Sequence, residues 1–252
     1  MPRLYCPVPL QTDTDILLDD VAARHVQVLR LQPGSALTLF DGRGGQYEAQ
    51  VVQMGRREVQ VRVGAHQARE CETRCALHLA VGIPANDRMD TLVEKACELG
   101  AASIQPLMSE RSVLRLSGER ALKKQAHWQA IAVAACEQSG RNRVPWVFPV
   151  RSLADWLAEG AFAQTPQLQA PQRAPAPAAL QKWVLSFAPN GTRAQPVLGN
   201  TTAALCLSGP EGGLSAPEEA AALLRGFQPL SLGPRTLRAD TAPLAALAIL
   251  TA

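Results

Sequence analysis

Hydrophobic and polar residues alternate along the first quarter of the chain, as they do in half-buried β-strands. The pattern predicts strands at 36–40, 47–52 and 58–63, with an apolar stretch at 26–31. Pro33-Gly34, Asp41-Gly42 and Gly44-Gly45 supply the turns between them. Several short strands separated by turns favour a small β-barrel domain over residues 1–68, with a polar linker at 64–75.

From residue 76 the pattern changes to alternating strands and amphipathic helices. Apolar runs predict strands at 77–83, 103–108, 183–187, 203–207 and 227–232. Helical spacing predicts helices from Asn86 or Asp87 to Gly100, over 119–139, and from about Asp240. Ser215 and Glu218 have the spacing of a capping box at another helix start. The alternation predicts an α/β domain over 76–252 with a mainly parallel sheet.

The amino-acid composition indicates a globular protein but does not narrow its function. The 252 residues are 47% hydrophobic and carry a net charge of +3. No apolar run approaches the roughly 20 residues that span a bilayer, and the first residues lack the apolar core of a signal peptide. We therefore expect a cytoplasmic protein without a membrane segment. Residues 164–180 are rich in Ala, Pro and Gln and are expected to form a flexible surface insertion without chemistry.

The six cysteines do not form a dense framework, so reduced thiols are expected. His66, Cys71, Cys75 and His78 could be written as four zinc ligands. Their spacing fits no common zinc signature, and His78 alternates with apolar residues in a predicted strand. We expect no metal.

Two predicted strands near the C-terminus run into loops rich in Gly and Pro. The first reads Leu205-Cys-Leu-Ser-Gly-Pro-Glu-Gly-Gly213, and its glycines can approach a ligand closely and adopt positive φ. No Gly-Lys-Ser/Thr follows and no G-x-G-x-x-G is present, which disfavours a triphosphate or a dinucleotide. Paired loops at the carboxyl ends of adjacent strands are typical of ligand sites in open α/β sheets, although a tight turn alone would also use glycine.

The second loop reads Leu232-Gly-Pro-Arg-Thr-Leu-Arg-Ala-Asp-Thr-Ala242. Asp240 is expected to cap the following helix. Capping this helix requires neither Arg235 nor Arg238. These two arginines are therefore candidates for contacts with an anionic group.

These two loops resemble the signatures of the bacterial 16S rRNA (uracil-N3)-methyltransferase family of the RsmE type, in the SPOUT class. Further segments that resemble the family are Lys95–Gly100, Pro106–Ser112 and Ala134–Pro145, and the N-terminal β region resembles its PUA-like domain. The resemblance covers nearly the whole chain except 164–180. Asp240 stands where the family more usually has Glu.

The resemblance implies a small N-terminal PUA-like β-barrel domain and a C-terminal SPOUT domain with a deep trefoil knot. It implies a homodimer, and S-adenosylmethionine (SAM) as methyl donor. The expected cofactor-binding residues are Leu185, Leu207, Gly209, Pro210, Glu211, Gly212, Gly213, Leu232, Gly233, Leu237 and Arg238.

The implied reaction methylates N3 of a specific uridine in 16S rRNA, with the free rRNA or the small ribosomal subunit as substrate. Uracil N3 is protonated at neutral pH, so the enzyme must remove that proton and stabilise the resulting anion. Arg238 or Arg235 could hold the anion, and Asp240 or Glu137 could accept the proton. Basic or polar residues expected to bind RNA are Arg3, Arg24, Arg30, Arg111, Arg141, Asn142 and Arg143.

Several alternatives stay open. Arg111 could pair with Glu110, and Arg141 to Arg143 could form a solvated loop after the helix. A related knotted enzyme could methylate a ribose 2′-hydroxyl or another base. A non-catalytic RNA-binding protein is a third possibility, against which the intact glycine and arginine loops argue.

Overall fold

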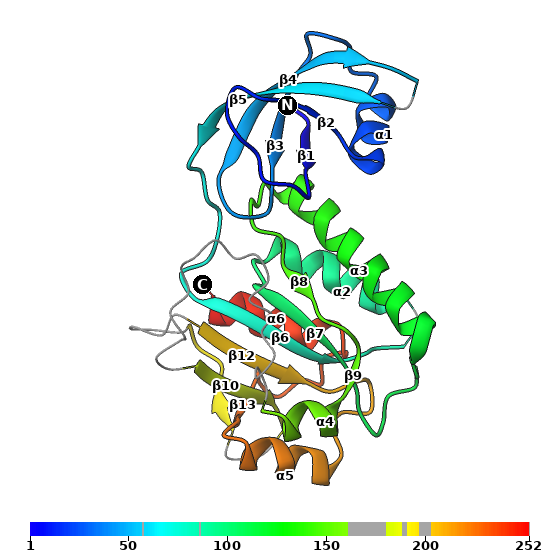
Figure 1. Ribbon diagram of the computed structural model, residues 1–252. Coiled ribbons are helices and arrows are strands. Elements are labelled where there is room, and N and C mark those ends of the chain that lie inside the picture. The colour runs from blue at the N-terminus through cyan, green and yellow to red at the C-terminus, as the bar shows by residue number, and fades with distance from the viewer. Residues whose placement is uncertain (57, 86, 161–179, 188–190, 197–202, 252) are drawn as a thin grey trace. The chain divides into compact units, whose positions relative to one another are not determined.

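The structure is a computed structural model that describes residues 1–252 except 57, 86, 161–179, 188–190, 197–202 and 252. The chain divides into two compact units (Figure 1). Unit 1 comprises Met1–Glu72 and Cys136–Val144, and unit 2 comprises Thr73–Ala135 and Pro145–Ala252. The sequence pattern predicts a boundary between 68 and 76 and assigns 136–144 to the second domain, whereas the structure places that segment in unit 1. The expected insertion lies outside the described residues, except Leu180.

Unit 1 contains a curved sheet whose described strands follow the order β1-β3-β4-β5-β2. The pair β1 and β3 is parallel, and the other pairs are antiparallel. The edge strands of this sheet are β1 and β2, so the expected barrel is open along one side. Its elements are β1 (Arg3–Tyr5), β2 (Asp15–Leu17), α1 (Asp20–Val28), β3 (Ala36–Phe40), β4 (Gln46–Met54) and β5 (Val59–Gln67).

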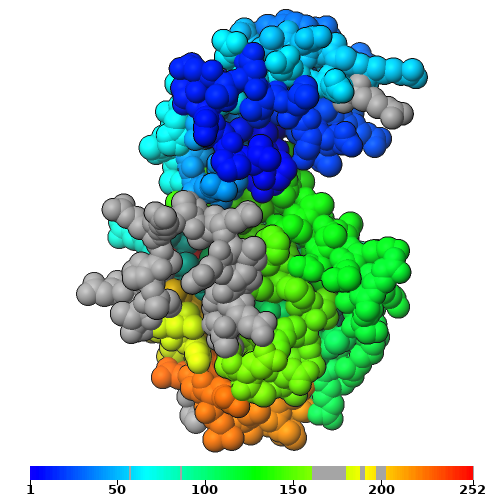
Figure 2. Space-filling view, in the orientation of Figure 1, coloured from blue at the N-terminus to red at the C-terminus, as the bar shows by residue number. Residues whose placement is uncertain are grey.

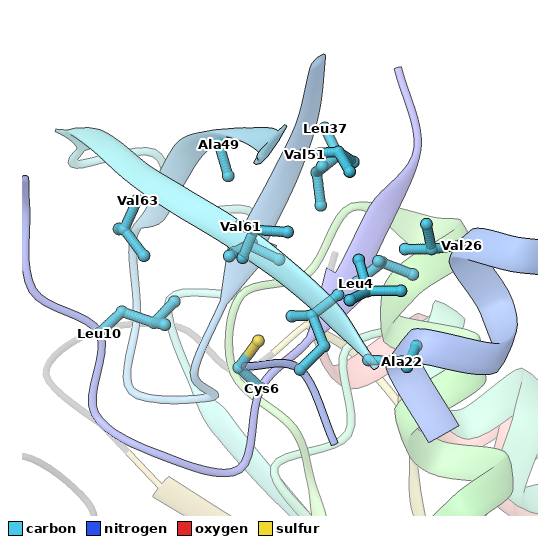
Figure 3. Close-up of a cluster of buried hydrophobic side chains, with 14 residues drawn as sticks. Leu4, Cys6, Leu10, Ala22, Val26, Leu37, Ala49, Val51, Val61 and Val63 are labelled. Atoms are coloured by element: carbon cyan, nitrogen blue, oxygen red, sulfur yellow. The ribbon is translucent and has the colours of Figure 1, made fainter. Parts of the chain in front are cut away.

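Alternation along the strands builds the core of unit 1. Val59, Val61 and Val63 of β5 are fully buried and face the same interior as Leu4 and Val26 (Figure 3). Strand β5 continues to Gln67, so the polar linker expected from residue 64 begins later.

The β-rich pattern does not predict helix α1. Asp19 caps this helix by accepting a hydrogen bond from the backbone N of Ala22 (2.8 Å), and Ala22, Ala23 and Val26 form its buried face.

Unit 2 is built on a sheet whose described strands all pair in parallel, in the order β11-β13-β10-β12-β6-β7-β8, with β9 beside β7. The elements before the insertion are β6 (Ala76–Gly82), α2 (Arg88–Glu98), β7 (Ser103–Met108), α3 (Gly118–Ser139), β8 (Trp146–Val147), β9 (Arg151–Ser152) and α4 (Leu153–Ala158). Those after it are β10 (Leu180–Leu185), β11 (Thr192–Arg193), β12 (Ala203–Ser208), α5 (Ala216–Leu224), β13 (Gln228–Ser231) and α6 (Thr241–Leu250).

Helices cover both faces of this sheet, which explains its nearly continuous apolar strands. All six residues of β12 are buried. Leu205 and Leu207 pack in one cluster with Trp156 of α4 and Ala222 of α5. These two helices lie side by side at the surface (Figure 2). On the other face α6 packs against α2, β6 and β12.

The strand order brings the two loops singled out by sequence next to each other. Strand β10 pairs with both β12 and β13, so the carboxyl ends of these three parallel strands meet at one edge of the sheet. Within the described residues, none of the helices is both long and apolar enough to cross a membrane.

Candidate functional site

A cavity of about 340 Å³ lies at this edge of the unit 2 sheet. It is formed by the segments that follow β10, β12 and β13, together with the start of α6 and Arg88 of α2. Its lining residues are Arg88, Leu185, Ser186, Phe187, Ser208, Gly209, Pro210, Glu211, Gly213, Leu230, Leu232, Gly233, Arg235, Thr236, Leu237, Arg238, Ala239 and Ala242.

Most of the residues expected to bind the cofactor line this cavity. They are Leu185, Gly209, Pro210, Glu211, Gly213, Leu232, Gly233, Leu237 and Arg238. Leu207 is instead fully buried in the core beneath α4 and α5. Gly212 lies against the side chain of Arg111, whose Cβ would be 3.1 Å from a Cβ at that glycine.

The glycines of the first loop serve different purposes. Gly213 has positive φ (68°), but Gly209 and Gly212 do not, so the expectation of positive φ is wrong for these two. Gly209 is needed for close packing, since a Cβ there would lie 2.7 Å from the backbone of Gly213. Gly82, at the end of β6, is required in the same way, because its Cβ would come within 2.5 Å of Pro210. The loop is therefore compact, and Gly209 and Gly213 line the cavity without a side chain.

Glu211 fixes the first loop to the segment that follows β6. Its Oε1 accepts hydrogen bonds from the backbone N of Ala85 (2.9 Å) and from Nη1 of Arg88 (3.2 Å). Glu211 and Arg88 thus neutralise each other at the cavity wall.

Arg111 fixes the same loop from the other side. Its Nη1 donates to the carbonyl oxygens of Gly212 (2.7 Å) and Leu214 (3.3 Å). The neighbouring backbone N of Glu110 donates to Oε1 of Glu218 (2.7 Å), while Oε2 of Glu218 accepts from the backbone N of Ser215 (2.9 Å). The Glu218 half of the predicted capping box is thus confirmed. Among the described residues no ion pair joins Glu110 and Arg111, so Arg111 holds loop carbonyls instead.

The arginines of the second loop have no such partners. Arg235 and Arg238 line the cavity, both are exposed, and neither makes a hydrogen bond or ion pair through its side chain within the described chain. The carbonyl of Arg238 accepts from the backbone N of Thr241 (3.0 Å) and Ala242 (2.9 Å), which fixes the start of α6. Two guanidinium groups are therefore available to an anionic ligand.

The prediction that Asp240 caps α6 is wrong. Asp240 occupies the position before the helix, but its backbone is already helical (φ −80°, ψ −32°) and its side chain makes no capping hydrogen bond. A capping side chain needs an extended backbone to reach the amides of the first turn. Asp240 Oδ1 is buried and has no partner among the described residues.

Sequence reasoning missed several lining residues, of which Ser208 is the most informative. Ser208 ends β12, is 2% exposed, and its Oγ has no hydrogen-bond partner in the described part of the chain. The signal was available, because a polar residue follows five apolar ones directly before Gly209. Ser186 and Phe187 could have been found in the same way, from their place just after β10.

Glu137 is engaged elsewhere. It belongs to unit 1, where its Oε1 accepts a hydrogen bond from the backbone N of Tyr5 (2.9 Å) and its Oε2 lies 3.5 Å from Nδ1 of His25. Burial raises the pKa of the Glu137 carboxyl, and the Tyr5 amide opposes that rise. The structure does not place Glu137 among the residues that line the cavity.

Three of the expected RNA-binding residues form an internal network in unit 1. Arg141 is 3% exposed and forms two hydrogen bonds to Glu72, from Nε to Oε1 (3.0 Å) and from Nη2 to Oε2 (2.5 Å). Asn142 is fully buried, donates to the carbonyl of Arg69 (2.6 Å) and accepts from Nη2 of Arg3 (2.7 Å). Their polar atoms therefore hold the segment 136–144 in unit 1.

The other basic residues of unit 1 face solvent. Arg24 and Arg30 are exposed, and Arg143 is exposed with its Nε 3.7 Å from Glu70 Oε2. These three side chains remain available to a phosphate group.

The candidate zinc ligands are distributed over both units. His66 and Cys71 belong to unit 1, and Cys75 and His78 to unit 2. Burial lowers the pKa of His78 to about 4, and its Nδ1 is 2.8 Å from Ser103 Oγ. Among the described residues no group of three or more His, Cys, Asp or Glu side chains is arranged to hold a metal ion.

Comparison with known protein families shows the class of protein to which this chain belongs. Residues 71–251 match the RNA methyltransferase domain, and residues 18–64 match the RNA methyltransferase PUA domain. A ribosomal RNA small subunit methyltransferase E from Synechocystis is 33% identical over 226 residues, covering 90% of this chain and 69% of that protein. The same enzyme from Bacillus subtilis is 28% identical over 227 residues, covering 90% and 85%. The chain therefore belongs to the family of ribosomal RNA small subunit methyltransferase E.

Solved structures agree with this assignment. Ribosomal RNA small subunit methyltransferase E from Neisseria gonorrhoeae, bound to SAM, has a TM-score of 0.85 and 36% identity, covering 98% of this chain and 96% of that one. A protein from Legionella pneumophila in complex with SAM has a TM-score of 0.83 and 32% identity, covering 98% and 95%. The fold class is confirmed as an N-terminal PUA-like domain with a C-terminal SPOUT-type parallel sheet. The knot stays a prediction, because 188–190 and 197–202 lie outside the described residues.

Proposed function

We propose that this chain is a SAM-dependent methyltransferase that methylates N3 of a uridine in 16S rRNA. The observation that carries the proposal is the cavity where β10, β12 and β13 end, with the arginines of the second loop in its wall. Family membership supports ribosomal RNA as the substrate, and the two similar structures bound to SAM support the cofactor.

The lining residues fit SAM. Its adenosine half is uncharged, and Leu185, Leu230 and Leu232 give the cavity a mostly apolar wall. Ser208 adds a buried hydroxyl without a partner among the described residues. Gly209 and Gly213 of the first loop also line the cavity and have no side chain that would keep a ligand from their backbone. Bound there, SAM supplies a methyl group on a positively charged sulfur, which a ring nitrogen can attack in line.

The chain itself must make uracil N3 nucleophilic. The N3 proton has to leave as the nitrogen–carbon bond forms, and negative charge then spreads onto the two carbonyl oxygens of the base. Arg238, exposed and unpaired among the described residues, places a guanidinium where it can stabilise that charge. Asp240 does not itself line the cavity, but it directly follows Arg238 and Ala239, which do. We assign the proton to Asp240 because its Oδ1 has no partner among the described residues, whereas Glu137 is engaged by Tyr5.

Unit 1 supplies the phosphate contacts in this proposal. Arg24, Arg30 and Arg143 are exposed, which suits binding to an RNA backbone. The target base has to be unpaired or turned out, because its N3 edge is otherwise engaged.

We also propose that the active form is a homodimer that uses α6. The helix is apolar all round, with the sequence Thr-Ala-Pro-Leu-Ala-Ala-Leu-Ala-Ile-Leu. Only Pro243, Ala246, Leu247 and Leu250 are buried within one chain. A helix of this kind is normally covered on every side, so Leu244 and Ala248 fit contact with a second copy. Sedimentation of Ala248→Glu should show monomers, and a dimer unchanged by that substitution would contradict this surface.

The reaction is tested with labelled SAM and unmethylated RNA, offered as free 16S rRNA and as assembled small subunits. We expect label in N3-methyluridine after digestion to nucleosides. Label in 2′-O-methylribose or in another base would overturn the acceptor atom. SAM binding without transfer to either substrate would overturn the enzyme assignment and favour an RNA-binding protein.

A further inference from the structure

Helix α3 carries three cations at the surface that neither the core nor the cavity uses. The helix runs along the outside of unit 2 (Figure 1). Arg120, Lys123 and Lys124 lie in its first two turns, and we call them the α3 basic face. Arg120 and Lys123 are exposed, Lys124 is half-buried, and none of the three lines the cavity. Residues three and four positions apart are neighbours on a helix surface, so the three charges form one contiguous surface.

The charges of the α3 basic face are largely uncompensated within the protein. Arg120 makes no side-chain hydrogen bond or ion pair in the described part of the chain. Lys123 pairs with Glu119 at 2.7 Å, but the two side chains are 75% and 79% exposed, and a pair so exposed contributes little. Asp90 of α2 attracts Lys124, yet both oxygens of Asp90 are hydrogen-bonded to other side chains of α3.

The stability of the helix does not explain these cations. Lysine and arginine stabilise a helix near its C-terminus and are unfavourable near its N-terminus, because of the direction of the helix dipole. Helix α3 has the reverse arrangement, with the α3 basic face at its start and no basic residue in its last turn. A partner that carries negative charge accounts for three cations at a place where the helix gains little from them.

The path of the chain brings α3 to the edge of the sheet at which the cavity lies. Strand β7 is parallel to β12 and two positions from it in the sheet, about 10 Å away. The segment after β7 returns to the end of that strand, where the backbone N of Leu116 donates to Sδ of Met108 (3.3 Å), and α3 begins at Gly118. Arg111 of the same segment bonds to the carbonyl of Gly212 in the first loop (2.7 Å). A polymer that enters the cavity therefore has the start of α3 on its side of the sheet.

We propose that the α3 basic face binds phosphate groups of ribosomal RNA, an inference that rests on the proposed function and adds a contact in unit 2 to those of unit 1. Exposed lysine and arginine side chains on a helix surface offer charge without a pocket that selects a base, which suits phosphates. About 6 Å of helix axis separate Arg120 from Lys124, so the face can meet more than one phosphate of a strand. The helix starts within the residues that match the RNA methyltransferase domain, which favours RNA over an acidic protein as the partner.

The test combines Arg120→Gln, Lys123→Gln and Lys124→Gln, which remove charge and keep good helix formers. Filter binding at several salt concentrations measures the affinity for small subunits and for protein-free 16S rRNA. We expect both affinities to fall by about tenfold or more, and the slope of log affinity against log salt to shrink by about two to three, because each lost phosphate contact removes about one.

Methylation kinetics of the triple variant give a second readout. The KM for the RNA substrate should rise by a factor similar to the loss of affinity, whereas the rate at saturating RNA should change far less. The dissociation constant for SAM and the melting temperature should match those of the parent chain, since the three side chains lie outside the cavity and the core.

Two single variants serve as controls. Arg225→Gln removes an exposed arginine that follows α5 and lies outside both the cavity and the α3 basic face, and it should keep the parental affinity and salt slope. Glu119→Gln removes the carboxylate that competes for Lys123, so it should strengthen RNA binding.

The possible results lead to different conclusions. Equal affinities and salt slopes of the triple variant and the parent would overturn the phosphate contact while leaving the proposed function intact. A loss confined to small subunits, with normal binding of protein-free 16S rRNA, would assign the surface to an acidic protein and overturn the RNA contact. An equal loss per charge in Arg225→Gln would also overturn it, because the effect would then be one of net charge. A parent chain that binds RNA through this face but transfers no methyl group would overturn the proposed function and support the surface.

Discussion

The segment Arg141–Arg143 and the loop Arg235–Arg238 each carry two arginines just after the end of a regular element, a helix in one case and a strand in the other. In unit 1, Arg141 is 3% exposed and bonded to Glu72. In unit 2, Arg235 and Arg238 are exposed at a cavity and make no side-chain hydrogen bond among the described residues. Arg141 of the first segment therefore pairs within the protein, whereas both arginines of the second loop remain available to a ligand.

The difference shows that a basic cluster in a sequence does not by itself identify a ligand contact. What decides is whether the fold brings a carboxylate within reach. Glu72 lies 69 positions before Arg141, and their pairing depends on the return of the segment 136–144 to unit 1. No comparable acidic residue pairs with Arg238 in the described chain.

The largest expected effect is a loss of stability, and we expect it for a substitution in the first segment but not in the second. Arg141→Ala removes the buried guanidinium and leaves the partly buried carboxylate of Glu72 (side chain 22% exposed) without its partner, which should cost about 3 kcal/mol of unfolding free energy. Thermal and urea unfolding measure the loss, and replacing both residues by Met should recover part of it. A variant of normal stability that binds RNA more weakly with a smaller salt dependence would show that Arg141 is an RNA contact after all.

In contrast to Arg141→Ala, Arg238→Ala should lower catalysis and leave stability nearly unchanged. The fold should be little affected, whereas turnover should fall by about 100- to 1,000-fold, the usual effect of removing a group that stabilises a developing anion. Single-turnover kinetics at saturating SAM measure this step. Arg225→Ala, an exposed arginine outside the cavity, is the matched control. Methylation at the parental rate by Arg238→Ala would remove this residue from the catalytic group.

Much of unit 2 could be predicted from its sequence, because its elements are long and their patterns are local. The strands near 77–83, 103–108 and 203–207 and the two loops after β12 and β13 were recognisable in this way. Helix α1 was not, since its buried residues are small and its start is marked only by Asp19 and Asp20. The roles of Arg111, Arg141 and Asn142 depend on contacts with residues about 70 to 140 positions away, which no local pattern contains.

Arg111 is intermediate between Arg141, which is buried and paired, and Arg238, which is exposed and unpaired among the described residues, and Arg111→Ala tests its role. Arg111 is exposed like Arg238 but bonded internally, to the carbonyls of Gly212 and Leu214. We expect the dissociation constant for SAM to rise roughly fivefold, because the exposed arginine contributes about 1 kcal/mol to holding the glycine loop. RNA affinity and its salt dependence should stay unchanged. Arg115→Ala, which loses only a bond to the Glu110 carbonyl, is the control. A reduced salt dependence for Arg111→Ala would make Arg111 an RNA contact.

The smallest effect is expected at Arg143, the neighbour of Arg141 that the fold leaves exposed. Its pairing with Glu70 at 3.7 Å is long and solvent-screened, so Arg143→Ala should change stability by less than about 0.5 kcal/mol. If Arg143 binds a phosphate, affinity for small subunits should fall a few-fold, and the slope of log affinity against log salt should shrink by about one. Glu70→Gln should act in the opposite direction, because it frees the guanidinium from a competing carboxylate. Equal salt slopes for all three proteins would mean that Arg143 contacts no RNA phosphate, and of the three arginines proposed in unit 1 only Arg24 and Arg30 would remain as phosphate contacts.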